Sequence, residues 1–145
     1  MTNTVTISCI INTTDPLSTL GFEAWVDDKK FVDIDHVTGE QPISMEILDD
    51  VGEHTLKFVL KNKTDAHTQI DESGAIISDA TLTLSDLAFD EIKLGYMTTN
   101  LAVYSHDFNG NGDLTEEKFH NVMGCNGTVT LKFATPIYLW LLEHM

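Results

Sequence analysis

Apolar and polar residues alternate with a period of two along most of this chain, and this alternation restricts the fold more than any other feature. The first example lies at residues 4–11, where every second residue is apolar: Val5, Ile7, Cys9 and Ile11. Residues 43–48 and 54–61 follow the same pattern. Successive side chains of a β-strand point to opposite faces, so the alternation predicts strands that each bury one face.

Turn-forming residues separate the alternating segments at short intervals. A hairpin is expected at residues 21–34, with its turn at 27–30. The remaining strands are expected at residues 75–77, 80–84, 87–94, 101–105, 128–134 and 137–143. The only helix that the sequence suggests lies at residues 114–123, where Thr115 could cap a short apolar stripe.

These elements predict one fold class for the whole chain. About nine or ten short strands, without regular alternation of strands and helices, are typical of antiparallel sandwiches. We therefore expect an all-β fold: a single antiparallel β-sandwich, jelly-roll-like, with at most one short helix, over residues 1–145. The last expected strand contains IYLWLL and is apolar on both faces, so it is either central in its sheet or covered by another subunit.

The charge of the chain excludes several kinds of partner. There are 23 acidic residues and eight lysines but no arginine, and the formal net charge is −15. Arginine supplies the bidentate contacts that read bases and phosphates, so no nucleic-acid partner is expected. The acidity also disfavours anionic membranes. It suits calcium, cationic partners or solubility in a salty medium.

The N-terminal residues, MTNTVTISCIINTTD, have no basic segment and alternate as a strand does, so no signal peptide is expected. The longest apolar run covers residues 137–142, far short of the ~20 residues that a membrane-spanning helix needs. We expect a soluble protein that is made in a cytoplasm and does not insert into a membrane.

The two cysteines, Cys9 and Cys125, lie far apart in the sequence and belong to no Cys/His cluster. Their spacing disfavours a structural zinc site and a disulfide framework. Either both are small buried thiols or they form one bridge.

The acidic segment YSHDFNGNGDLTEEKF, at residues 104–119, resembles part of an EF-hand calcium loop. Counted from Asp107, seven loop positions agree: Asp107, Asn109, Asn111, Gly112, Asp113, Leu114 and Thr115. The closing position is Lys118 instead of glutamate, so Glu117 could complete the site only after a one-residue distortion. The residues before Asp107 alternate as a strand. The segment is therefore either a calcium-binding loop of a β-protein or an acidic turn, and calcium is the one cofactor it suggests.

No motif in the sequence indicates catalysis. The chain has no G-x-S-x-G, no glycine-rich phosphate loop and no Cys/His dyad, so no enzyme is expected. Trp25 and Trp140 are the candidates for a ligand contact, because a tryptophan can stack on a sugar ring. Either could instead be buried in the core or in an interface.

Two blocks cover most of the sequence: residues 21–94, from GFEAWVDDKKFVDID to FDEIKL, and the ending FHNVMGCNGTVTLKFATPIYLWLLEHM. Both blocks resemble a small protein family of contractile-tailed marine cyanophages. The first block also looks more loosely like calcium-dependent carbohydrate-binding sandwich modules. That likeness lies in a hairpin at residues 23–32 and in strands at residues 52–58 and 90–94.

The phage resemblance implies a virion protein that decorates the capsid, neck or tail. Its partners would be other virion proteins or further copies of itself, and it would act without catalysis. The alternative is a carbohydrate-recognition module for host adhesion, with a host surface glycan as ligand and calcium as a helper ion.

Overall fold

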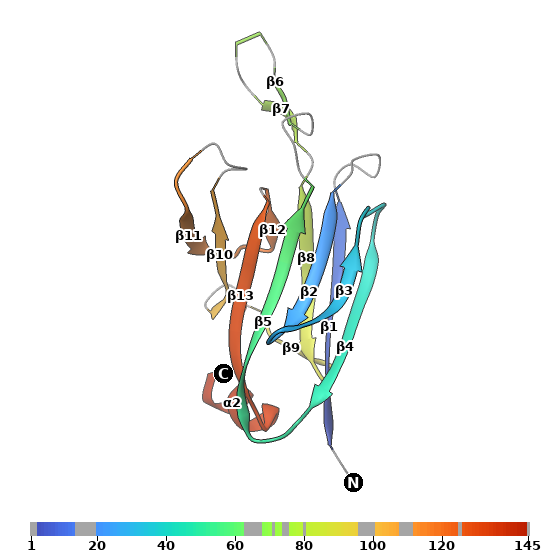
Figure 1. The fold of residues 1–145 in the computed structure, drawn as a ribbon, viewed down its shortest axis with the longest axis vertical. Helices are drawn as coiled ribbons and strands as arrows, with labels where there is room; N and C mark the ends of the chain where they lie inside the picture. The colour runs from blue at the N-terminus through green and yellow to red at the C-terminus, as the bar shows by residue number, and fades with distance from the viewer. Residues whose placement is uncertain are drawn as a thin grey trace.

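A computed structural model describes residues 3–13, 20–62, 68–70, 72–73, 76–79, 81–95, 101–107, 112–124 and 126–144. Strands dominate these residues, and they form two antiparallel sheets of a sandwich with one short C-terminal helix (Figure 1). The predicted all-β fold is therefore confirmed. In the described part of the chain, no helix is long and apolar enough to span a membrane.

The five-stranded sheet has the order β12-β8-β1-β4, and β9 pairs with β8 beside this path. Its strands are β1 (Thr4–Thr13), β4 (Gln41–Leu48), β8 (Leu82–Phe89), β9 (Ile92–Lys93) and β12 (Val122–Met123). The central strand β1 pairs antiparallel with β4 on one side and with β8 on the other. β4 is thus an edge of this sheet.

The six-stranded sheet has the order β11-β10-β13-β5-β2-β3. Its strands are β2 (Gly21–Val26), β3 (Lys29–Ile34), β5 (Gly52–Lys61), β10 (Val103–His106), β11 (Thr115–Lys118) and β13 (Gly127–Thr135). The predicted hairpin at residues 21–34 is β2–β3, and Asp27 in its turn has φ 56°. The outer strand of the hairpin, β3, is an edge of this sheet.

The chain passes from one sheet to the other at many of its connections. β1 pairs with β4 in the five-stranded sheet, and the β2–β3 hairpin between them in sequence belongs to the six-stranded sheet. The β1–β4 pair and the β2–β3 pair are thus two parts of one antiparallel ladder, and each part belongs to a different sheet. This arrangement is typical of a jelly roll. The edge strands β3 and β4 consequently lie on the same side of the molecule (Figure 1). A third, two-stranded sheet of β6 (Thr68–Ile70) and β7 (Ile76–Asp79) projects from one end.

One hydrophobic cluster joins the inner faces of the two large sheets. It includes Val5, Ile7 and Cys9 from β1, and Leu56 and Phe58 from β5, all nearly inaccessible to solvent. The alternation in the sequence therefore marks the buried faces correctly. Cys9 is a free thiol in this core, and burial raises its pKa to about 12. Cys125 lies outside the described residues.

The expected last strand is wrong: residues 137–144 form the helix α2 (Ile137–His144). Its buried residues are Ile137, Trp140 and Leu141, which have helical spacing. Asp49 binds the start of α2, where its Oδ1 accepts a hydrogen bond from the Ile137 amide at 2.8 Å. A short run that is apolar throughout fits a strand and a helix equally well, so periodicity could not separate the two.

The expected helix at residues 114–123 is also wrong, because these residues contribute to β11 and β12. Phe119 and Met123 are fully buried, and their spacing of four resembles a helical stripe. They are instead separated by Asn121, whose φ of 70° redirects the chain from one sheet to the other. β11 forms because its residues complete a hairpin with β10.

Candidate functional site

The acidic loop is described only in part. Asn109 and Asn111 lie outside the described residues, whereas Asp107, Asp113 and Glu117 lie inside them. The Gly112 amide donates to the Asp107 carbonyl at 3.0 Å, and the Thr115 hydroxyl donates to the Asp113 carbonyl at 3.1 Å. Both backbone carbonyls thus take part in the turn itself.

Glu117 occupies a position in the β10–β11 ladder. It is paired with Tyr104, and its Oε1 lies 3.5 Å from Nε2 of His106. The carboxylate of Glu117, which would have to close a calcium loop, therefore lies in the β10–β11 ladder beside the buried His106. Within the described ranges, no three His, Cys, Asp or Glu residues are grouped to hold a metal ion. Calcium binding by the whole loop remains a prediction.

Trp140 belongs to the core. Only 6% of its surface is exposed, and its ring packs edge-on against Phe89 and Phe133, with centroids 5.8 Å and 6.3 Å away. The His144 ring lies 4.6 Å from it on the next turn of α2. Trp140 thus fixes the helix to the sandwich and presents little ring surface to a ligand.

Trp25 lies on the outer face of the six-stranded sheet and is half-buried. Its Nε1 donates to Oε1 of Glu23 at 2.9 Å, and Nζ of Lys30 lies 5.3 Å from its ring centroid. The structure therefore separates the two tryptophans: one is packed inside, and the other is held in a fixed orientation on a polar face.

An ion-pair network surrounds Trp25. Lys61 Nζ lies 2.8 Å from Glu23 and 2.5 Å from Asp33, and Lys30 lies 3.0 Å from Asp33. The hydrogen bond from Lys61 is the main cause that holds the pKa of Glu23 below its ordinary value. The same lysine, together with Lys30, lowers the pKa of Asp33. The carboxylates of Glu23 and Asp33 therefore stay charged at neutral pH.

A shallow hollow of about 500 Å³ lies beside Trp25 on the same outer face, and we call it the outer groove. It crosses from β2 to β11 and is lined by carboxylates, hydroxyls and one lysine, including Glu23, Lys57, Ser105, Glu116, Thr128 and Thr130. An aromatic ring beside several hydrogen-bonding side chains is an arrangement that suits a polar, ring-shaped ligand such as a sugar.

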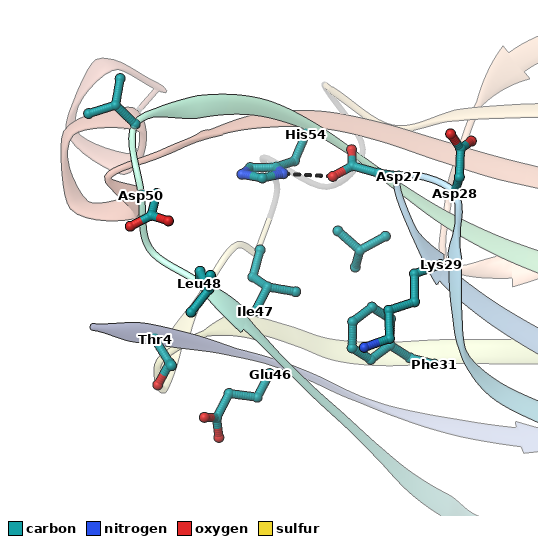
Figure 2. Close-up of a pocket in the computed structure, with 12 residues that line it drawn as sticks. Thr4, Asp27, Asp28, Lys29, Phe31, Glu46, Ile47, Leu48, Asp50 and His54 are labelled. Atoms are coloured by element: carbon teal, nitrogen blue, oxygen red, sulfur yellow. Dashed lines mark hydrogen bonds and ion pairs between the residues drawn. The ribbon is translucent and has the colours of Figure 1, made fainter. Parts of the chain in front are cut away.

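A second, larger hollow of about 800 Å³ lies between the β2–β3 turn and β4, and we call it the side groove. Figure 2 shows its residues, with Phe31 on one strand and Ile47 and Leu48 on the other. Asp27 and His54 border it, and their side chains are joined by a hydrogen bond of 2.8 Å. The side groove is therefore apolar at its floor and polar at its border.

His54 also contacts Thr135, which makes a chain of three polar side chains. Its Nε2 lies 3.1 Å from the Thr135 hydroxyl, which donates to the Asp50 carbonyl. The order carboxylate, imidazole, hydroxyl resembles a catalytic triad. Only 4% of Thr135 is exposed, however, so a substrate cannot reach its hydroxyl in this conformation. These three hydrogen-bonded side chains join the β2–β3 turn, β5 and β13 at one end of the sandwich.

Asp27 has a lowered pKa. Burial alone would raise it, but the hydrogen bonds from His54 and from the Thr55 amide outweigh burial. The sequence pattern did not lead us to single out His54 or its contact with Asp27. The signal was present, because His54 has the same parity in β5 as the buried Leu56 and Phe58.

Exposed apolar side chains gather around α2. Tyr138, Leu139 and Leu142 are 51%, 60% and 69% exposed, and Val51 in the neighbouring β4–β5 connection is 88% exposed. The hydrogen bond from Ile137 to Asp49 ties that connection to α2. We call these four residues the terminal apolar patch.

Comparison with protein-family models, with curated proteins and with solved structures finds no match for this chain.

Proposed function

We propose that the chain is a non-enzymatic component of a phage particle, and that it attaches to neighbouring particle proteins through the terminal apolar patch. The phage assignment rests on the resemblance of residues 21–94 and 119–145 to a cyanophage protein family. The mode of action rests on one observation, the exposure of Tyr138, Leu139 and Leu142 on a single helix.

The sandwich covers only one face of the helix α2. Trp140 and Leu141 are buried against the sandwich, whereas the adjacent apolar residues face solvent. Exposed apolar surface that is grouped in this way is typical of protein interaction sites. Covering it would supply the favourable burial that holds an accessory protein on a particle.

The burial of the Thr135 hydroxyl supports a role without catalysis. The one carboxylate–imidazole–hydroxyl chain in the described residues has a buried hydroxyl. Its geometry suits a link between strands at the end of the sandwich.

The test is incorporation into particles. Mass spectrometry of purified virions of the encoding phage should detect the chain at a copy number that matches a symmetric shell, neck or tail ring. Supplied in trans, the double variant Leu139→Asp, Leu142→Asp should be lost from particles. Leu114→Asp is the control, because Leu114 is 73% exposed outside the patch. Absence of the unmodified chain from virions would refute the particle role.

A second function, glycan recognition for host adhesion, is favoured by the outer groove. Trp25 is already oriented by Glu23 and Lys30, so little side-chain freedom would be lost when a sugar stacks on it. Serine, threonine and carboxylate groups within reach could bind sugar hydroxyls.

A glycan array tests this second function. Binding should be abolished in Trp25→Ala and kept in Tyr138→Ala, which removes an exposed aromatic residue elsewhere. Repeating the array with a chelator tests whether calcium at the acidic loop is needed for glycan binding. If no glycan on the array binds, glycan recognition should be abandoned, whatever the result with virions.

A further inference from the structure

We propose that the side groove binds an extended segment of a partner protein in which bulky apolar side chains are flanked by lysine or arginine. The side groove adjoins the terminal apolar patch at Val51 but is otherwise lined by residues outside that patch. This inference therefore goes beyond attachment through α2, because it assigns a further surface and the chemistry of its occupant.

The floor of the side groove supplies the apolar half of the recognition. Val26 is buried, Phe31 and Ile47 are partly buried against the core, and Leu48 is 52% exposed at the border. In Figure 2, Phe31 and Ile47 come from the two opposing edge strands, β3 and β4, and both line the side groove. Apolar side chains of a partner that filled this space would leave water for an apolar environment, which is favourable.

The border of the side groove supplies the charged half. Four carboxylates line it and one lysine opposes them: Asp27, Asp28, Glu46, Asp50 and Lys29. Asp27 is engaged by His54 and by the Thr55 amide. Among the residues that the structure describes, the carboxylates of Asp28, Glu46 and Asp50 make no ion pair. Lys29 is placed over the Phe31 ring at 4.8 Å. Basic residues on either side of an apolar segment would complement this border.

The strands beside the side groove favour an extended occupant. In the described part of both sheets, β3 and β4 each pair with one neighbouring strand only. Their outward backbone groups can therefore pair with an added strand, as in β-augmentation. A groove of about 800 Å³ between two such edges fits a short strand better than a single side chain.

Charge argues against a second copy of this chain as the occupant. A symmetric dimer through the side groove would bring two sets of the same carboxylates together, on molecules that each carry a net charge of −15. The acidic border also repels anionic lipid. A cationic protein segment satisfies both the floor and the border.

Peptide binding tests the inference on the intact chain. The probe is a fluorescein-labelled peptide, Lys-Lys-Thr-Ile-Thr-Phe-Thr-Lys-Lys, and its counterpart has glutamate in place of every lysine. Fluorescence anisotropy should show saturable binding of the lysine peptide and at least about tenfold weaker binding of the glutamate peptide. Binding should weaken as salt rises from about 0.05 to 0.5 M.

Two exposed substitutions locate the site. Leu48→Lys and Glu46→Lys, at exposed positions that line the side groove and not the outer groove, should each weaken binding of the lysine peptide about tenfold or more, while Leu114→Lys leaves it unchanged. The inference is overturned by no saturable binding up to about 1 mM, by equal binding of both peptides, or by insensitivity to both groove variants. Because Leu139 and Leu142 are untouched, this outcome is separate from the result of the virion test.

Discussion

The two tryptophans of this chain lie in regions of opposite character. Trp140 is packed among Phe89 and Phe133 at the end of the sandwich, and its neighbours are apolar or aromatic. Trp25 lies on an open sheet face, and its neighbours are Glu23 and Lys30. The same side chain thus holds a helix in one region and is available for a ligand in the other. The difference comes from what surrounds each ring.

Truncating the buried tryptophan should produce the largest effect. Trp140→Ala removes a buried aromatic side chain and leaves a cavity, so the free energy of unfolding should fall by about 3–5 kcal/mol. Urea unfolding measures this loss. The matched variant Trp25→Ala should cost clearly less, because its ring is only half-buried. Equal losses in the two variants would remove the contrast between the regions.

The attachment of α2 should depend on Asp49. Asp49→Ala removes the acceptor of the Ile137 amide at the first residue of the helix, and should lower the free energy of unfolding by about 1 kcal/mol. Thermal unfolding and hydrogen exchange of the α2 amides measure the change. Asp113→Ala is the control, because Asp113 is an exposed acidic residue that precedes β11. Unchanged protection of α2 would show that packing of Trp140 alone holds the helix.

The region around Trp25 should be sensitive to acid. Glu23 has a lowered pKa in the folded state, so its contribution to stability is present above the unfolded pKa, about 4.3. That contribution is lost as pH falls through the folded pKa. In Glu23→Gln, the loss of melting temperature on acidification should be smaller than in the unmodified chain. The corresponding difference in the free energy of unfolding should stay below about 1 kcal/mol, because these ion pairs are partly exposed. An identical acid profile in the variant would contradict this assignment.

The smallest effect is expected at Tyr138, beside the buried tryptophan. The charge of Asp90 is the main cause that raises the pKa of this phenol, and Asp90 Oδ2 lies 3.3 Å from its hydroxyl. Asp90→Asn should move the pKa of Tyr138 back toward its ordinary value, as an ultraviolet titration would show. Asp86→Asn, at another exposed carboxylate, should leave it in place. A titration that is unchanged in Asp90→Asn would show that this pair is not formed in solution.

Much of the fold could be predicted, because alternation reports burial directly. Parity predicted strands at residues 4–11 and 128–134 and within the hairpin at 21–34. The observed strands are Thr4–Thr13, Gly127–Thr135 and the β2–β3 hairpin, and their inner faces are those of the core. The ends of the strands were harder to predict from the sequence. The predicted break between residues 84 and 87 is a bulge within the continuous strand β8, where Asp86 has φ 55°. A residue with positive φ resembles a turn in the sequence, although the strand continues through it.

The candidate sites were less predictable than the fold. Trp25 and Trp140 were equivalent in the sequence, since each lies in an apolar segment, and only the packing of α2 distinguished them. The contact of Asp27 with His54 joins residues that are 27 positions apart. The side groove needs Phe31 of β3 and Ile47 of β4 to face each other across two sheets. No local pattern encodes such a juxtaposition.

The sequence by itself determined the period-two pattern, the antiparallel sandwich and an acidic chain with no arginine. These properties follow from residue types and their order, because parity sets which face of a strand is buried. The tertiary structure alone decided which strands became edges, that the terminal apolar run is a helix, and which tryptophan remained accessible. The physical reason is that parity assigns a face to a side chain but not a partner strand. Grooves and patches arise only when elements distant in the sequence are brought together.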